Sequence, residues 1–309
     1  MGVTKYNSLN CGDNVVPGTA IPSCVRGSNG QASKPFFFEK GVTIPLASVT
    51  LAGLKALIKQ RKLHVLPKFD GFKSANSQNS TVTSEYNVES ETVKGLPKWE
   101  MEFWKGDAFD NLLQRFGGQD QFDFLLGFQD GVRFYANSDD TALTGGDAGM
   151  VNVGIQTDQD KSNAQKQMLT VQLKDAAQHN FRKVFKSYAE LGFNEGDLKP
   201  VYDVDVEFNA APAAGTSLVV NVAYGLTGLP VIGLGGSPLL FKLQGTQATP
   251  RTITAAAAVV GVPGRYTLTL SGAIVSTDTV KALLGDSTYD VAEDVTGNLY
   301  AGESALATV

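Results

Sequence analysis

The residues best suited to nucleophilic or acid–base chemistry are two histidines, His64 and His179. A nucleophile usually works with a histidine that a third group orients. His64 lies just before Pro67, and His179 lies in the run Gln178-His179-Asn180. Each is a lone histidine in a polar neighbourhood, so we expect both at the surface and neither in catalysis.

Carboxylates at alternate positions could in principle supply the paired acids of a glycosidase. They occur as Glu100 and Glu102 and as Asp203, Asp205 and Glu207. Apolar residues occupy the positions between them, which is typical of the solvated side of a strand. We therefore interpret both sets as exposed sheet faces and predict that the protein is not an enzyme.

Two groups of residues could bind a metal ion. Asp139, Asp140 and Asp147 share a polar segment, but they lack the D-x-[DN]-x-[DN]-G order of a calcium loop. Cys11 and Cys24 lack neighbouring ligands that would complete a zinc site. We expect two free thiols, with a disulfide as the alternative, and no metal.

A glycine-rich run, Gly233-Leu-Gly235-Gly236, does not match a dinucleotide-binding loop. Pro238 stands where that fingerprint requires its third glycine. No phosphate-binding Gly-Lys-Ser or Gly-Lys-Thr occurs. We expect no cofactor.

The composition excludes other classes. The 309 residues are 42% hydrophobic and 18% charged, with a net charge of −5, which argues against nucleic-acid binding as the main task. No apolar run approaches a membrane span and no secretory signal is visible, so we expect no membrane contact.

The elements that would position these residues divide near Pro200. The part after it has four basic residues against nine acidic ones and so carries the whole net charge, whereas basic and acidic residues balance before it. We predict a β-rich assembly domain over 1–200, with an N-terminal arm, and a second domain over 201–309.

Glycine and proline residues recur throughout 1–45, and because they interrupt helices and strands, they predict an irregular segment. Phe36-Phe37-Phe38 is the exception, because neighbouring residues of a strand face opposite sides. The triplet is therefore buried on both faces within its own domain, or one face is covered by a neighbouring subunit.

The rest of the first part alternates strands with short helices. The patterns predict helices over 50–62, 107–116 and 175–188, with Thr50 and Asp107 as N-caps. Residues 81–93 and 98–103 look like two antiparallel strands, with Trp99, Met101 and Phe103 on one face. Further strands are expected over 63–66, 122–128, 132–136, 150–156 and 167–173. Mobile or polar loops are expected over 74–80 and 137–149, and 193–200 reads as a linker.

The second part reads as seven or eight short strands in about 109 residues. That number and length predict an immunoglobulin-like β sandwich. The Cys…Trp…Cys signature of true immunoglobulin domains is missing. The fold class is therefore mainly β with a few short helices: an N-terminal β sandwich or barrel and a C-terminal immunoglobulin-like sandwich.

The chain resembles bacteriophage tail tube proteins that carry an added immunoglobulin-like domain. The resemblance rests on the segment Glu89-Ser-Glu-Thr-Val-Lys-Gly-Leu-Pro-Lys-Trp-Glu-Met-Glu-Phe-Trp104, the short helix after it, Gln129-Asp130-Gly131 and Gly297-Asn-Leu-Tyr-Ala-Gly302. It implies a virion structural protein, assembled in the host bacterial cytoplasm, that forms stacked rings, usually hexameric. Its partners would be copies of itself and other virion proteins, and DNA would pass through without specific binding.

Two other functions fit the same sequence. One is a capsid decoration or head-fibre protein. The other is a glycan-binding surface module, in which 201–309 would contact cell-surface glycans.

Overall fold

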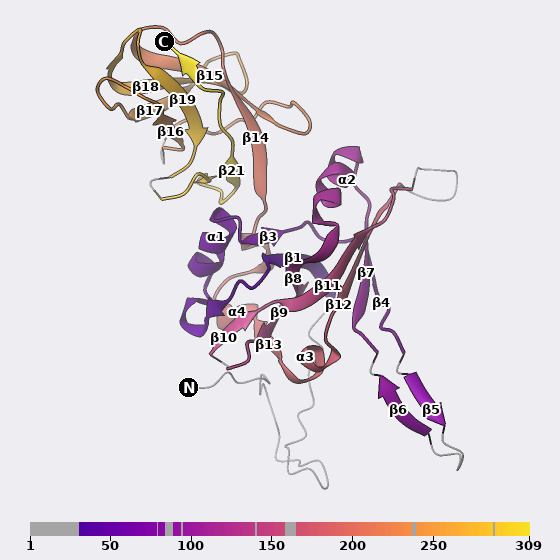
Figure 1. The fold of residues 1–309 in the computed structure, drawn as a ribbon. Coiled ribbons are helices and arrows are strands. Elements are labelled where there is room, and N and C mark those ends of the chain that lie inside the picture. The colour runs from indigo at the N-terminus through magenta and orange to yellow at the C-terminus, as the bar shows by residue number, and fades with distance from the viewer. Residues whose placement is uncertain are drawn as a thin grey trace. The chain divides into compact units, whose positions relative to one another are not determined.

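A computed structural model describes residues 31–78, 80–83, 89–93, 95–139, 141–157, 165–236, 239–286 and 288–309. The chain forms two compact units, Met1–Leu198 and Lys199–Val309, whose boundary lies close to Pro200 (Figure 1). Both are built mainly of antiparallel strands with few, short helices, as the sequence predicted. The units are described separately below.

Within its described residues, the first unit contains four α-helices, three short 3-10 turns and thirteen strands. The helical segments are η1 (Leu46–Ser48), α1 (Leu51–Lys59), α2 (Asp107–Leu113), η2 (Gln114–Phe116), α3 (Ala176–Phe181), α4 (Tyr188–Leu191) and η3 (Glu195–Asp197). The strands are β1 (Ala32–Glu39), β2 (Ile44–Pro45), β3 (Leu63–Val65), β4 (Gly71–Ser74), β5 (Ser80–Thr83), β6 (Glu89–Val93), β7 (Lys98–Phe103), β8 (Gly118–Phe128), β9 (Gly131–Ala136), β10 (Ala142–Thr144), β11 (Gly146–Val153), β12 (Gln167–Leu173) and β13 (Lys183–Ser187).

Strand β8 is the centre of an eleven-stranded sheet, in which the main path runs β2-β10-β9-β8-β11-β12-β7-β4. Strand β1 pairs along one side of β8. On the other side, β11 pairs with the first part of β8 and β9 with its last three residues. The sheet therefore divides along β8 and curls around an aromatic core.

The triplet Phe36-Phe37-Phe38 lies in β1, between β3 and β8, and all three side chains are buried within this unit. Phe37 packs in the core against Phe116, Phe122 and Phe124. The prediction of an irregular segment is wrong for 32–39. Cover by a neighbouring subunit is not needed, because each side chain of the triplet is 1% exposed or less within the single chain.

The first helix begins as predicted. Thr50 accepts a hydrogen bond from the N–H of Gly53, and Leu54 and Ile58 are buried on one face. The second helix differs at both ends. Asp107 is its first residue, Gly106 is the N-cap, and Gly117 is extended rather than left-handed.

Strand β7 buries Trp99, Met101 and Phe103 on one face, as its alternation predicts. Its partners are not those expected, because it pairs with β4 and β12, whereas β5 and β6 pair with each other. Alternation identifies which face is buried but does not identify the neighbouring strand. Tyr86 and Val88, part of that prediction, lie outside the described residues.

Three predicted segments are wrong. Residues 137–149 contain β10 and the start of β11 rather than one loop. Helix 175–188 is α3 followed by β13, which pairs with β9. Residues 75–78 are not a free loop, because the N–H groups of Ala75 and Ser77 donate to the carbonyls of Lys98 and Leu96.

The second unit is a two-sheet sandwich. Its strands are β14 (Val201–Phe208), β15 (Gly215–Tyr224), β16 (Phe241–Gln244), β17 (Ile253–Ala258), β18 (Arg265–Ile274), β19 (Thr279–Leu284), β20 (Ala292–Glu293), β21 (Leu299–Ala301) and β22 (Ala307–Thr308). One sheet runs β17-β18-β15-β14-β21-β20 and the other β16-β19-β22. The first sheet contains β17-β18-β15-β14 in the D-E-B-A order of the immunoglobulin-like sandwich, with β21 and β20 added beside β14, and β16-β19-β22 corresponds to its C-F-G sheet.

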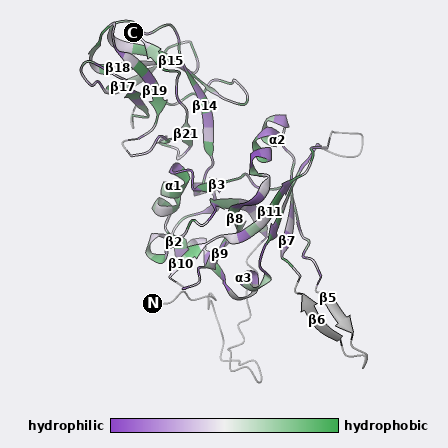
Figure 2. Ribbon diagram, in the orientation of Figure 1, coloured by the Kyte–Doolittle hydropathy of each residue, from purple (hydrophilic) through white to green (hydrophobic). Residues whose placement is uncertain are grey.

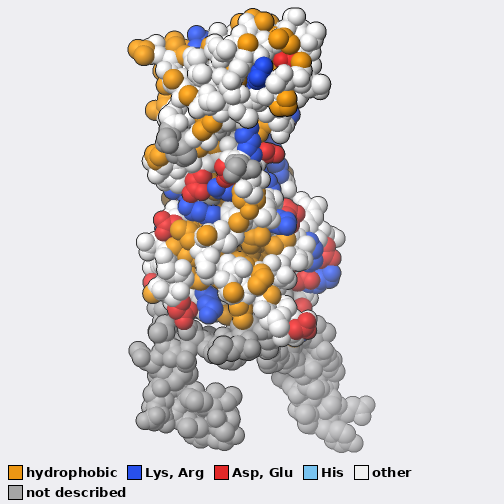
Figure 3. Space-filling view, turned by 90° about the vertical axis from the view of Figure 1, so that its left-hand side faces the viewer, with side chains coloured by type: hydrophobic (Ala, Val, Ile, Leu, Met, Phe, Trp, Pro, Cys, Tyr) orange, Lys and Arg blue, Asp and Glu red, His pale blue; other side chains and the backbone are white. Residues whose placement is uncertain are grey.

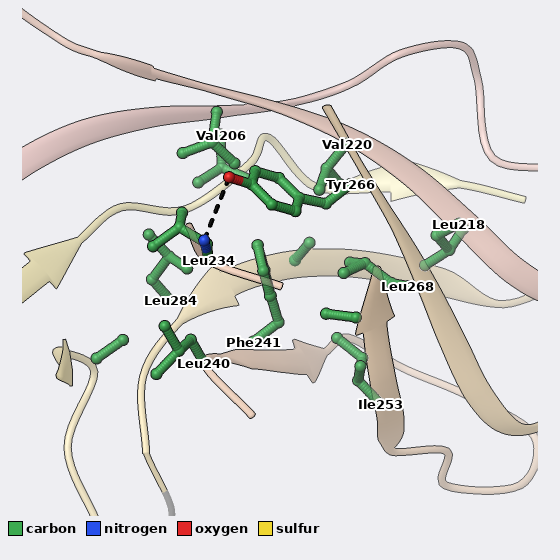
Figure 4. Close-up of a cluster of buried hydrophobic side chains, with 14 of the residues drawn as sticks. Val206, Leu218, Val220, Leu234, Leu240, Phe241, Ile253, Tyr266, Leu268 and Leu284 are labelled. Atoms are coloured by element: carbon green, nitrogen blue, oxygen red, sulfur yellow. Dashed lines mark hydrogen bonds between the residues drawn. The ribbon is translucent and has the colours of Figure 1, made fainter. Parts of the chain in front are cut away.

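The two sheets of this unit enclose one core. Val204 and Val206 of β14 point into it, and hydrophilic residues alternate with them along the strand (Figure 2). Tyr266 of β18 reaches across the core, where its hydroxyl accepts from the N–H of Leu234 and donates to the carbonyl of Val231 (Figure 4). Residues 231–234, which belong to none of the strands, are thus an irregular segment held by a buried tyrosine.

Candidate functional site

Neither histidine lies free on the surface, contrary to the prediction. His64 lies in β3, with Nε2 2.6 Å from a carboxylate oxygen of Glu39 at the end of β1. Its ring meets Phe116 and Phe122 edge to face. The histidine therefore ties β3 to β1 and to the aromatic core.

His179 lies in α3, half-buried against the ring of Trp99, and its Nδ1 is 3.0 Å from the hydroxyl oxygen of Tyr135. Burial, together with the nearby cations Lys183 and Arg133, lowers the pKa of His179 to about 3. Burial also raises the pKa of Tyr135, whose side chain is inaccessible to a substrate. The pair joins α3 to β9.

The paired carboxylates lie on strand faces, as predicted. Glu100 and Glu102 alternate with the buried residues of β7. Glu100 forms an ion pair with Lys98 at 3.0 Å, and Glu102 forms one with Lys166 at 3.1 Å. Asp203, Asp205 and Glu207 are exposed along β14.

The acidic segment predicted as a possible calcium loop is divided. Asp147 is paired with Lys40, whose Nζ also lies 3.3 Å from both Asp120 and Asp123. Lys40 thus occupies the point at which three carboxylates meet. Within the described residues no cluster of histidine, cysteine and acidic side chains is suited to a metal ion. Asp140, Cys11 and Cys24 lie outside those residues.

The feature with the strongest potential for binding is the edge of the first unit's sheet, strand β4. Among the described strands, β4 pairs with β7 alone. The pairing continues beyond β4, since Ala75 and Ser77 also bond to the chain preceding β7. Alternate residues of an antiparallel strand point their backbone groups away from the partner, so the N–H and C=O groups of Phe72, Ser74 and Asn76 face away from β7 and pair with no other strand in the part of the chain that the structure describes.

The core is incomplete at this edge. Phe72 lies directly opposite the buried Met101 and therefore on the core face of the sheet, yet it is 39% exposed. Its ring stacks on Phe69 at 5.1 Å, and Phe69 packs against the core. A strand added beside β4 would cover Phe72 and bond to the open backbone.

Protection of the edge is sparse. Lys73 is the one charged residue of β4, and no proline occurs between 71 and 77. Natural proteins usually blunt such edges with charge, proline or a covering element. No strand was predicted over 71–74 from the sequence, because a four-residue strand that contains glycine is too short to show a period.

The surface differs between the units. On the face shown in Figure 3, charged side chains are frequent over the first unit and sparse over the second. Large exposed hydrophobic side chains of the second unit include Leu229, Ile232 and Val260. None of the helices in the described residues is long and apolar enough to cross a membrane.

Comparison of this chain with models of protein families, with curated proteins and with solved structures found no match.

Proposed function

We propose that this chain is a structural subunit of a bacteriophage particle that assembles into rings, and that stacked rings form a tail tube through which DNA passes. The observation that carries the proposal is the open edge at β4, where unpaired backbone and a half-exposed Phe72 adjoin each other. A second copy can extend the sheet at such an edge, because backbone hydrogen bonds supply affinity and the apolar side chain supplies register. The resemblance to tail tube proteins supports the same assembly.

The charge distribution supports passage of DNA without adhesion. Affinity for the phosphate backbone comes from lysine and arginine contacts that release counterions. The first part of the chain has no excess of basic residues, and the second part is acidic. A wall of neutral or acidic surface would repel DNA weakly and leave it free to move.

Negative-stain electron microscopy of the purified protein tests the proposal. We expect rings or short tubes for the natural chain. Ser74→Pro should abolish them while leaving the monomer folded, because proline removes an N–H that faces away from β7. Ile155→Lys is the matched control, since Ile155 is exposed but is not part of β4.

The outcomes separate the candidate functions. A natural chain that stays monomeric at high concentration contradicts the proposal. If that chain binds preformed capsids, the function is capsid decoration. If the natural chain and Ser74→Pro both form rings, the assembly stands but β4 is not its edge.

A further inference from the structure

A buried charged cluster lies where the chain leaves the first unit. Lys34 and Ser33 of β1 and Glu195 of η3 are each less than one-tenth exposed. Burying charged groups is costly unless they are paired and hydrogen bonded. Here Lys34 is hydrogen bonded to backbone carbonyls, and Glu195 is hydrogen bonded to Ser33 and paired with Lys68, so the cluster fixes η3 against β1.

Lys34 holds the backbone of the departing segment. Its Nζ donates to the carbonyl oxygens of Glu195 at 2.9 Å and Leu198 at 3.0 Å. The Glu195 carboxylate accepts from the hydroxyl of Ser33 at 2.5 Å and pairs with Nζ of Lys68 at 2.7 Å. Two carbonyls of the last four residues of the unit are therefore bonded to a single ammonium group.

In the second unit, the first residue after the boundary, Lys199, is also held by hydrogen bonds. Nζ of Lys199 donates to the carbonyl of Thr296 at 2.8 Å and to Oδ1 of Asn298 at 2.9 Å. Two residues later β14 begins, with Val201 paired to Leu299. The chain is thus anchored at Leu198, at Lys199 and from Val201 onward.

We propose that Lys34 and Lys199 form a two-sided anchor that keeps the junction between the units short, and that the Lys34 side is a latch that can open. The Lys199 side is reinforced by the β14–β21 ladder, whereas residues 195–198 are in no strand. Opening the latch would release the carbonyls of Glu195 and Leu198, and if Glu195 then also leaves Ser33 and Lys68, about four residues and about 14 Å of reach are added to the linker.

The chemistry of Lys34 makes it the side that opens. Burial lowers the pKa of Lys34 to about 8, with Glu195 opposing the decrease and Lys68 contributing to it. The charged groups that face the latch are these two side chains, and the buried hydroxyl of Tyr188 lies in the field of Glu195. Loss of the Lys34 proton removes its attraction to Glu195, so the latch weakens above that pH.

The test is limited proteolysis of the full chain by a protease of low specificity, with cleavage sites identified by mass spectrometry. Lys34→Met keeps the apolar stem and removes the ammonium group. We expect cleavage within 194–200 to become at least about tenfold faster. Lys68→Met is the control, because Lys68 pairs with Glu195 but holds no carbonyl of the segment.

A Lys34→Met chain as protected at 194–200 as the natural chain would overturn the proposal. Cleavage of the variant throughout the first unit would mean that it does not fold. The test is then hydrogen exchange of the natural chain, measured at pH 7 and at about pH 9.5. After correction for the intrinsic rate, faster exchange of 195–198 at the higher pH supports the latch, and equal exchange overturns it. Neither result depends on whether the protein forms rings.

Discussion

At the residue scale, polar groups that the sequence presents as candidates for chemistry serve instead to join elements. His179 bonds to Tyr135, and Lys40 pairs with two aspartates of β8 and one of β11. Sequence reasoning assigned both histidines to the surface because their immediate neighbours are polar. Burial depends on residues far along the chain, such as Trp99 beside His179.

The buried His179 predicts a loss of stability in acid. The unfolded chain binds a proton at an ordinary histidine pKa of about 6.5, whereas the folded chain resists until about pH 3. The free energy of unfolding is therefore unaffected by His179 above about pH 6.5, and it decreases as the pH falls from there towards 3. One proton corresponds to at most about 1.4 kcal/mol per pH unit, and less for a partly exposed ring.

Urea unfolding between pH 7 and pH 4 measures this effect. Both tryptophans lie in the first unit, so their fluorescence reports that unit alone. We expect His179→Gln, which keeps an acceptor for Tyr135, to show a shallower decline than the natural chain. Equal slopes for the two proteins would contradict the assignment.

At the element scale, the strands predicted over 122–128 and 132–136 lie in β8 and β9, which form a hairpin. Its turn is Gln129-Asp130. Position 131 requires glycine because β13 pairs with β9 there and its backbone leaves no room for a side chain. A methyl group there would lie 2.2 Å from the carbonyl oxygen of Lys186.

Gly131→Ala should therefore push β13 away from β9. We expect a loss of about 1–3 kcal/mol in the free energy of unfolding, measured by urea titration of tryptophan fluorescence. Gly196→Ala is the matched control, since nothing lies within 4 Å of an added methyl group there. A cost no larger than that of the control would show that β13 adjusts without strain.

At the scale of the whole molecule, the two units have separate cores and separate sheets. Nothing in the proposed ring requires the immunoglobulin-like unit. A chain truncated after Pro200 should keep its assembly and lose the net charge of −5 that 201–309 carries. Electron microscopy and native electrophoresis check the two expectations, and a folded but strictly monomeric truncation would overturn this division of labour.

Local pattern alone determined much of this protein. Alternation placed Trp99, Met101 and Phe103 on a buried face, Thr50 marked a helix start, and the strand count after Pro200 predicted the sandwich. These features depend on residues within one or two turns or strands of each other. The periodicity of the backbone and the pattern of polar and apolar side chains are therefore enough to predict these features from the sequence.

Only the tertiary structure decided which strands are neighbours. It placed β4 and β12, rather than 81–93, beside β7, and so created an open edge at Phe72. It also brought Lys34 to Glu195, about 160 positions along the chain. Such contacts depend on burial gained across the whole core, and a strand's own residues fix its faces but not its partner.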